Sequence, residues 1–363
     1  MDSQALQALA AQLVRIQSPS GSEEAVAQFC AQWFESKGLA TERLDKTLVV
    51  RVPGKPGPRL LLNSHYDTIP AGDMWETDPW DVAWIDERLT GLGANDAKGC
   101  VAAMMMATAE LAAGPALNGE LILSLHQEEE TNNRGMELVR EHVGPVDLAI
   151  TGEPTGCEVI RSQSGLAVFR LNWQGKACHA AHISRVDHEN ALLQAAGELA
   201  QWKAPFLLPG EHELLGPSTL SPTVMHSGSR HNLIPDGAEV IFDARLAPPH
   251  DAAECVRILE EAFPQAKVTV RSERLGPKDT AADHPLVLEA LAVLGHQRAL
   301  GSNTLSDMAL LPGVPAIKCG PGQTVRSHTA GEFITRQELQ QGAEFYSQVI
   351  PRVFNALQSQ PAQ

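Results

Sequence analysis

Residues 121–131 read LILSLHQEEET, an apolar run typical of a buried strand that leads straight into Glu128, Glu129 and Glu130. Adjacent carboxylates repel one another, and the chain already carries a formal net charge of −16. A cation close to the three glutamates would reverse this penalty, because it favours ionised carboxylates. The stretch therefore raises two expectations: a strand of a sheet, and a charged site at the end of that strand.

Strand and helix patterns alternate on both sides of this stretch. Such alternation predicts an α/β layer with a largely parallel sheet. Strands are expected at residues 47–52, 59–65, 117–126 and 145–151, and helices at 98–113 and 133–142.

A further helix is predicted within residues 18–38. Ser20 and Glu23 have the spacing of a capping box, and Ser22 is an alternative N-cap. Gly38 is a natural stop, because glycine readily adopts the left-handed conformation that ends many helices.

The pattern changes at about residue 161. From there to residue 274 the strands and helices follow in the order βαββαβ, which is the ferredoxin-like unit. After residue 275, two helices and a strand resemble the first layer again, and a chain of 363 residues exceeds the usual size of one core. We therefore predict an α/β domain made of residues 1–160 and 275–363, with an inserted domain at 161–274.

The composition narrows the class of protein. A hydrophobic content of 43% with 20% charged residues is typical of a soluble globular protein. The acidic balance argues against nucleic acid or an anionic membrane as a partner. We find no signal peptide and no apolar run long enough to span a bilayer. The six cysteines show no CxxC spacing and read as reduced thiols, so we predict a cytoplasmic protein.

Several predicted strands end in side chains that bind metals. His65 ends the strand at 59–65 and Asp67 comes shortly after it, Glu153 follows the strand at 145–151, and Asp96 and His328 lie in other connections. In open α/β sheets, ligands bind beyond the carboxyl ends of the strands. Imidazole and carboxylate groups together suit zinc, cobalt or manganese.

Each of these residues also has an ordinary structural explanation when it is taken alone. A histidine after a strand is commonly a hydrogen-bonded structural residue. Asp96 could cap the helix that follows it, Glu153 could be a turn residue, and the glutamates could form a solvated helix start. The combination of two histidines and several carboxylates at strand ends favours a metal site.

Five motifs together resemble the dinuclear-zinc aminoacylases and exopeptidases, the family that includes acetylornithine deacetylase and succinyl-diaminopimelate desuccinylase. They are SHYDT (64–68), GLGANDAKG (91–99), QEEET (127–131), TGEPT (151–155) and GPG…SHTAGEF (320–333), and they occur in order over nearly the whole chain. The resemblance implies a zinc-exopeptidase-like α/β catalytic domain with an inserted ferredoxin-like lid or dimerisation domain. It also implies a homodimer that forms through the insertion.

The resemblance further implies two divalent metal ions, with zinc expected and cobalt or manganese as alternatives. Asp67 would orient the first metal's histidine, and Glu129 would be the general base. A cis peptide bond would follow the bridging aspartate. The implied ligands are His65 and Glu153 for the first metal, Glu130 and His328 for the second, and Asp96 as the bridge between them.

The register of the three glutamates stays open at this point. Relatives often have Asp-Glu-Glu-Thr where this chain has Glu-Glu-Glu-Thr. Alignment on Thr131 and Gly135 assigns Glu130 to the metal and Glu129 to the base, and Glu128 then stands at the aspartate position. A shift of one residue would exchange these roles.

The resemblance also implies residues that contact the substrate. His179 would stabilise the oxyanion, often across a dimer, and Asn232 matches another position of the family. Arg245 suits a substrate carboxylate, and a surface ion pair is the alternative role for it. Ser306 and Gly320 are further candidates that would line the pocket.

The chain departs from the family at two positions. Ser64 stands where a glycine is commoner, and Ser164 stands where many members have a lysine before a glycine. The second change removes a positive charge that could face the substrate, so it puts the acyl and side-chain specificity in doubt.

The activity expected from these motifs is removal of the acetyl group from N-α-acetyl-L-ornithine, a step of arginine biosynthesis. Alternatives within the family are deacylation of N-acetyl-citrulline, N-acetyl-lysine or succinyl-diaminopimelate, and hydrolysis of dipeptides or C-terminal residues. A non-catalytic binding protein on the same fold is disfavoured, because every ligand position and a base are present. A Rossmann dehydrogenase is set aside, because no GxGxxG follows the first strand.

Overall fold

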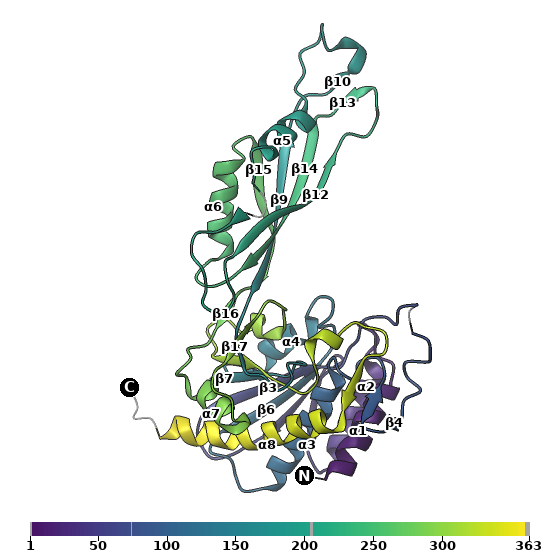
Figure 1. Cartoon of the computed structure of the whole chain (residues 1–363), viewed down its shortest axis with the longest axis vertical. Coiled ribbons are helices and arrows are strands. Elements are labelled where there is room, and N and C mark those ends of the chain that lie inside the picture. Colours follow the sequence, from purple (N-terminus) through teal and green to yellow (C-terminus); the bar gives the residue numbers. More distant parts are fainter. Residues whose placement is uncertain (1, 74, 204–205, 360–363) are drawn as a thin grey trace. The chain divides into compact units, whose positions relative to one another are not determined.

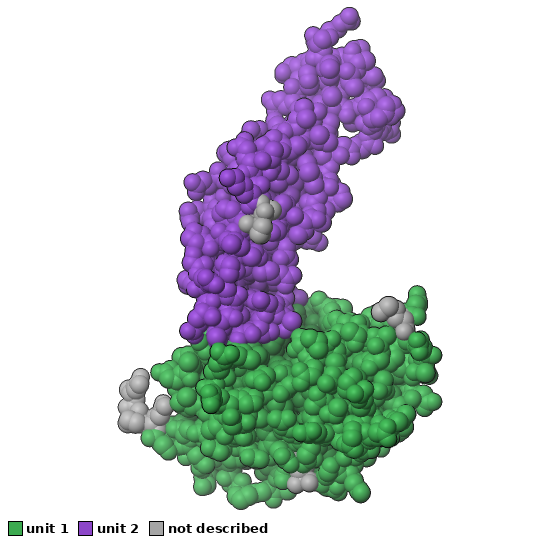
Figure 2. Space-filling view, in the orientation of Figure 1, with its two compact units in different colours: residues 1–161, 279–300, 306–363 green, residues 162–278, 301–305 purple. Residues whose placement is uncertain are grey.

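The computed structural model describes residues 2–73, 75–203 and 206–359. Contacts divide the chain into two compact units, which Figure 2 colours separately: residues 1–161, 279–300 and 306–363, and residues 162–278 and 301–305. The boundaries near 161 and 275 differ from the predicted ones by one and four residues, and residues 301–305, which were predicted in the first domain, belong to the second unit. They join the second unit because Ser302 O accepts a hydrogen bond from Ser164 N at 3.0 Å and Asn303 Oδ1 accepts one from Ser164 Oγ at 2.8 Å.

A mixed sheet forms the centre of the first unit, with the strand order β1-β2-β6-β3-β7-β18-β8-β16 and β17 paired to β8 (Figure 1). Its central strands β6, β3, β7 and β18 run parallel, so their carboxyl ends lie at one edge. The strands are β1 (Thr41–Leu44), β2 (Thr47–Val52), β3 (Arg59–His65), β6 (Glu120–His126), β7 (Leu148–Thr151), β8 (Ile160–Gln163), β16 (Lys278–Asp279), β17 (Leu300–Ser302) and β18 (Ala316–Lys318).

Helices cover both faces of this sheet. Alternate apolar residues such as Leu60, Leu62 and Leu123 face one main core, which α1 (Ser3–Arg15), α2 (Glu24–Ser36), α3 (Lys98–Ala113), α7 (Pro285–Leu294) and α8 (Arg336–Gln358) complete. The opposite face carries α4 (Arg134–Val143) and the short helix η2 (Asp307–Leu310). The strands β4 (Trp84–Ile85), β5 (Arg88–Thr90) and β19 (Phe333–Thr335) form a small antiparallel sheet.

The predicted capping box of α2 is wrong. Helix α2 begins after Glu23 without a side-chain cap. Ser20 Oγ instead donates to Asp67 Oδ2 at 2.7 Å, and Glu23 Oε1 accepts from Glu128 N at 3.1 Å. Both residues that matched a local helix signal are therefore used by the charged edge of the sheet. Gly38 has a φ of +75°, as expected for a helix stop.

The second unit has the predicted order βαββαβ. Its antiparallel sheet has the strand order β11-β12-β14-β9-β15, with α5 and α6 on one face (Figure 1). Along β9, buried and half-buried residues alternate, as a strand with one covered face requires. The elements are β9 (Gly165–Gln174), α5 (Ala191–Leu199), β11 (Phe206–Leu207), β12 (Thr219–Ser227), β14 (Gly237–Leu246), α6 (Ala252–Ala262) and β15 (Ala266–Leu275), and β10 (Cys178–His179) pairs separately with β13 (Leu233–Ile234).

The α/β fold class is thus confirmed, and the parallel centre of the sheet matches the expectation from strand–helix alternation. None of the helices described for this chain combines the length and apolarity needed to cross a bilayer.

Candidate metal centre

The carboxyl edge of the parallel strands gathers the predicted ligands. His65 ends β3, Glu130 lies in the loop after β6, Glu153 follows β7 and His328 lies in the connection after β18. Asp96 comes just before α3. In the described part of the chain, His65, Asp96 and Glu153 form one group of potential ligands and Asp96, Glu130 and His328 form another; within each group the ligand atoms lie within 4.8 Å of one another.

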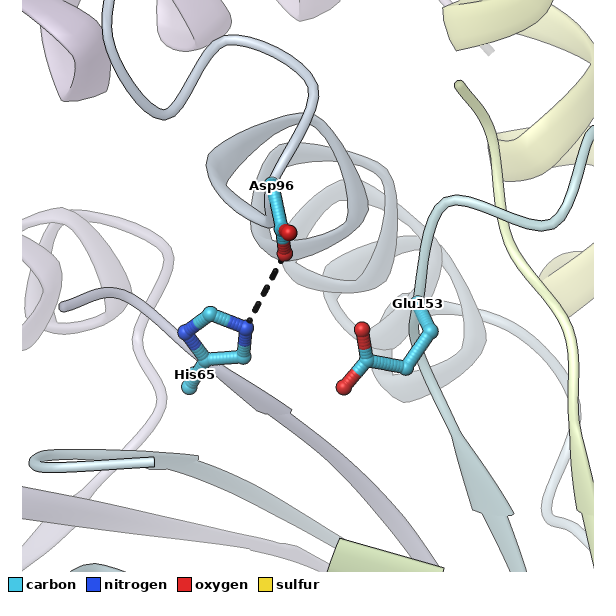
Figure 3. A group of neighbouring side chains, drawn as sticks. All are labelled: His65, Asp96 and Glu153. Carbon is cyan, nitrogen blue, oxygen red and sulfur yellow. Dashed lines mark ion pairs between the residues drawn. The ribbon is translucent and has the colours of Figure 1, made fainter. Parts of the chain in front are cut away.

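In the first group, His65 is held in one orientation. Its Nδ1 lies 3.1 Å from Asp67 O and 3.4 Å from Asp67 Oδ1, and its Nε2 lies 3.3 Å from Asp96 Oδ1. Nδ1 therefore carries the proton toward Asp67, and Nε2 faces the group, as Figure 3 shows. Burial alone would lower the pKa of His65, but the neighbouring carboxylates of Asp67 and Asp96 hold that pKa well above the ordinary value.

In the second group, His328 Nε2 lies 2.8 Å from Glu130 Oε1 and 3.8 Å from Asp96 Oδ2. The hydrogen bond to Glu130, helped by the charges of Glu130 and Asp96, raises the pKa of His328 to about 9. His328 itself has a φ of +60°, an uncommon conformation for a residue with a side chain.

Asp96 is the residue that both groups share. Its Oδ1 is buried and accepts no hydrogen bond of acceptable geometry, although His65 Nε2 is 3.3 Å away. An orphaned buried carboxylate oxygen among imidazole nitrogens and carboxylates fits a divalent cation such as zinc. The N-cap of α3 is Ala97, so Asp96 does not cap this helix. The Asp96–Ala97 peptide bond is cis, as the resemblance implies.

A second carboxylate, Glu332, holds the backbone that carries Asp96. Glu332 Oε1 accepts hydrogen bonds from Asp96 N at 2.8 Å and from Asn95 N at 2.7 Å, and Oε2 accepts one from Gly93 N at 3.1 Å. Burial raises the pKa of Glu332 to about 7, against these backbone hydrogen bonds. Glu332 lies within the motif SHTAGEF, which was the sequence signal for this residue, although no role for Glu332 follows from the motif alone.

The backbone of the three glutamates is held by two buried carboxylates. Glu128 N donates to Glu23 Oε1 at 3.1 Å. Glu129 N and Glu130 N donate to the two oxygens of Asp67 at 3.1 and 3.2 Å. Asp67 thus orients His65 and the glutamate loop together.

The three glutamate side chains point to different partners. Glu128 accepts from Asn132 Nδ2 at 2.6 Å and lies 3.9 Å from Lys46 Nζ, outside both ligand groups. Glu130 belongs to the second group, and Glu129 belongs to neither. This geometry favours the register with Glu130 as a ligand and disfavours Glu128 for that position.

Glu129 and Glu153 lie among other acidic side chains. Burial raises the pKa of Glu129 well above its ordinary value, and the charges of Asp307, Glu153 and Glu130 act in the same direction. Burial, with the charge of Asp96, raises the pKa of Glu153 to about 8. Bound cations would favour the ionised forms of both carboxyls.

Asp67 shows the opposite balance. Burial alone would raise its pKa, but its hydrogen bond to His65 and the bonds from Ser20 Oγ and Glu129 N hold that pKa below the ordinary value. Its carboxylate therefore favours the ionised form, which accepts the hydrogen bonds from Ser20 Oγ, Glu129 N and Glu130 N.

Sequence reasoning missed three further charged or polar groups close to this edge. Lys318 ends β18 with 2% of its surface exposed, and it interacts electrostatically with Glu153 and Glu129. His126 and Asp307 form a buried pair next to the glutamate loop. Lys318 lies two residues before the quoted motif GPG, and Asp307 directly follows the candidate residue Ser306.

Gly320, Ser306 and Ser64 also lie in the first unit, and the structure shows what surrounds each of them. A Cβ at Gly320 would lie 2.8 Å from Glu153 O and 2.7 Å from Tyr346 Oη, so glycine is required for this close approach. Ser306 is buried and precedes Asp307. Ser64, which stands where relatives have glycine, donates from its Oγ to Gly152 O at 2.8 Å.

The remaining three candidates lie in the second unit. His179 and Asn232 are neighbours, because β10 pairs with β13 and Ala180 N donates to Asn232 O at 2.9 Å. His179 Nδ1 accepts from Ala181 N at 3.1 Å, which leaves Nε2 as the protonated nitrogen of the neutral ring. Arg245 lies near the C-terminal end of β14, whereas His179 and Asn232 lie near its N-terminal end. Arg245 pairs with Asp243 at 2.9 Å.

Comparison with known proteins places the chain among amide hydrolases. The model of peptidase family M20/M25/M40 matches residues 61–352. Succinyl-diaminopimelate desuccinylase from Xanthomonas euvesicatoria pv. vesicatoria is 29% identical, with 83% of this chain and 85% of that protein covered. Acetylornithine deacetylase from Klebsiella pneumoniae is 27% identical, with 91% of each covered. N-acetyl-L-citrulline deacetylase from Xanthomonas campestris pv. campestris is 26% identical, with 81% of each covered.

Solved structures agree in fold. Aminopeptidase PepT from Bacillus cereus superposes with a TM-score of 0.78 at 19% identity, covering 97% of this chain and 99% of that one. The YXEP protein from Bacillus subtilis, described as a dinuclear metal-binding peptidase, gives a TM-score of 0.74 at 16% identity, covering 99% of each chain.

Proposed function

The chain belongs to peptidase family M20/M25/M40 and is a metal-dependent hydrolase of amide bonds, and from this premise we propose that it removes the acetyl group from N-α-acetyl-L-ornithine. The observation that carries the proposal is the pair of ligand groups that share Asp96, with the carboxyl of Glu129 outside both groups but interacting electrostatically with His65, Glu153 and Glu130. The relative named acetylornithine deacetylase covers 91% of this chain. The formal charge of −16 also favours a substrate that carries an amine.

We propose that the two groups hold two divalent metal ions, zinc in preference to cobalt or manganese. His65 and Glu153 would hold the first ion, Glu130 and His328 the second, and Asp96 would contact both. When bound, two such ions polarise an amide carbonyl, and they lower the pKa of a water so that it can lose a proton and act as a nucleophile at neutral pH. Asp67 faces Nδ1 of His65 and favours the proton on that nitrogen, so Nε2 would be the atom that holds the first ion.

Glu129 would then take a proton from the attacking water and pass it to the departing amine. Its backbone is fixed by Asp67, and its carboxyl is not a member of either ligand group. Burial, together with the surrounding acids, raises the pKa of Glu129, so this carboxyl holds a proton more readily than an exposed glutamate does, which suits a group that must both accept and release one.

In the second unit, we propose that His179 and Asn232 stabilise the oxyanion and that Arg245 binds the substrate carboxylate. Roughly 26 Å of strand separates Arg245 from Gly237, at about 3.3 Å per residue, and Gly237 lies at the end of β14 nearest His179. One N-acyl amino acid is too short to touch His179 and Arg245 of the same chain. Two chains would let each substrate meet one residue from each.

We therefore propose a homodimer that forms through the second unit. Pairing of β11 covers β12 only at Thr219 and Leu220, so within the described residues the rest of that edge has backbone groups free for another strand. Exposed apolar side chains accompany it: Val224 and Met225 on β12, and Leu192 and Leu193 on α5.

Leu193→Glu is expected to convert the dimer into a monomer, because it places a charge in an apolar contact. Light scattering after size-exclusion chromatography measures the mass. Leu288→Glu is the matched control, since Leu288 is a helical leucine of the first unit with 50% exposure, against 65% for Leu193. A wild-type protein that is already monomeric, or a Leu193→Glu variant that stays dimeric, would contradict this interface.

The six cysteines are free and buried, which supports a reducing, cytoplasmic location. Fractionation of the native cells would check it, and recovery of the protein outside the cytoplasm would count against it.

The substrate proposal is tested with chelated protein that is reconstituted with zinc. Initial rates are measured on N-acetyl-ornithine, N-acetyl-citrulline, N-acetyl-lysine, N-succinyl-diaminopimelate and a set of dipeptides. We expect the highest kcat/KM on N-acetyl-ornithine. A preference for another N-acyl amino acid would reassign the substrate, and cleavage of dipeptides alone would overturn the deacylase proposal.

A further inference from the structure

The loop 127–132, which carries the three glutamates, is bracketed by one buried carboxylate from a distant part of the chain. Asp307 Oδ2 is hydrogen-bonded to the Nε2 of His126, the last residue of β6. Asp307 Oδ1 accepts from Nδ2 of Asn133, the residue before α4, at 3.1 Å. Asp307 therefore ties together the residue before the loop and the residue after it.

Asn133 connects this bracket to the candidate base. Its Nδ2 also donates to Glu129 O at 3.3 Å, and its backbone N donates to Glu128 O at 2.6 Å. Asn133 has a φ of +56°, so the chain turns sharply at this point before entering α4.

The bracket is built as a buried unit. His126, Asp307 and Asn133 have 0%, 1% and 6% of their surfaces exposed. A carboxyl group buried at such a position needs hydrogen-bond partners, and His126 and Asn133 supply them. The same loop carries three carboxylates that repel one another, so a loop left unbraced would move away from the ligand groups.

We propose that Asp307 is a positioning residue that acts through His126 and Asn133. It closes the loop 127–132 and holds Glu129 in the place where it can exchange a proton with the reacting groups. Asp67 fixes the same loop from the side of the first ligand group, so the base is held between two carboxylates. The effect on turnover rests on the proposed function, whereas the effect on the loop does not.

The test compares Asp307→Ala, Asn133→Gly and the double variant. Glycine is chosen at position 133 because it accepts the positive φ and removes only the side chain. We expect each single variant to lower kcat about 10- to 100-fold with KM changed less than about threefold, as for a misplaced catalytic group. The double variant should be no slower than the slower single variant, because both changes break one chain of contacts.

Asn132→Ser is the matched control. Asn132 lies on the same loop and contacts Glu128, and serine keeps an acceptor for Arg134 N. We expect its kcat to stay within about twofold of wild type, since it does not touch Asp307. Multiplying effects of the two single variants, or an equal loss in Asn132→Ser, would show general destabilisation and overturn the positioning role.

Amide hydrogen exchange gives a readout that is independent of any substrate. Exchange at Glu129 and Glu130 should be at least about tenfold faster in Asp307→Ala and Asn133→Gly than in wild type, and unchanged in Asn132→Ser. If the wild-type protein cleaves no amide but exchange is still faster in the Asp307→Ala and Asn133→Gly variants, the proposed function would be wrong and the role of the bracket would stand. Unchanged exchange in Asn133→Gly, which is the variant least disturbing to the fold, would overturn the bracket.

Discussion

Glu129→Gln is expected to lower kcat by about 10²- to 10⁴-fold and to leave the bound metal unchanged. Glutamine keeps the shape of the side chain and the backbone hydrogen bond to Asp67, but it cannot take up a proton. Glu129 lies outside both ligand groups, so metal content should stay at the wild-type value. Steady-state kinetics and elemental analysis of the same preparation measure the two effects.

Glu128→Gln is a closely matched control for Glu129→Gln. Glu128→Gln changes the same functional group one residue away, at a side chain that contacts Asn132 and Lys46. We expect near-normal turnover from it. Near-normal turnover in Glu129→Gln with a severe loss in Glu128→Gln would show that the register is shifted by one residue.

The second large effect is expected from Asp96→Ala. Asp96 is the member common to both ligand groups in the described chain, so its loss should weaken both metals together. The carbonyl polarisation and water activation attributed to such metals are worth several kcal/mol, which corresponds to roughly a 10³-fold or greater loss of kcat/KM. Elemental analysis after dialysis, together with kinetics at saturating zinc, measures both losses.

His328→Ala separates this effect from a general disturbance of the fold. His328 belongs to the second group alone and is half exposed, so its removal should release one metal and keep the other. Retention of both metals in Asp96→Ala, with thermal stability like that of wild type, would contradict the bridging role.

Much of the fold could be predicted because it depends on local patterns. The apolar runs at 59–65 and 121–126 and the strand–helix alternation define a parallel sheet whether or not any relative is known. The positions of His65, Glu153 and the glutamates follow from this, since parallel strands end at one edge. Their assignment to particular metals needed the resemblance.

Contacts between distant residues could not be predicted in the same way. Ser20 and Glu23 have the spacing of a helix cap, yet their side chains bind Asp67 and Glu128. A capping box and a pair of buried site residues have the same local sequence, and tertiary contacts decide between them. Asp307 is paired with His126 although the two residues are 181 positions apart in the chain, and no local sequence pattern predicts that pairing.

The second unit could likewise be predicted only in part from the sequence. The order βαββαβ was readable, but residues 301–305 joined this unit through hydrogen bonds to Ser164 that only the folded chain reveals. The family resemblance implies a substrate role for Arg245, and the structure adds that it pairs with Asp243 and lies toward the end of β14 away from His179.

The most direct test of a dinuclear hydrolytic centre is anomalous diffraction at the zinc edge from crystals of the zinc-reconstituted protein. We expect two peaks in each chain. One should lie among His65, Asp96 and Glu153, and the other among Asp96, Glu130 and His328. A single peak in a fully active preparation, or a second peak away from these residues, would contradict the account.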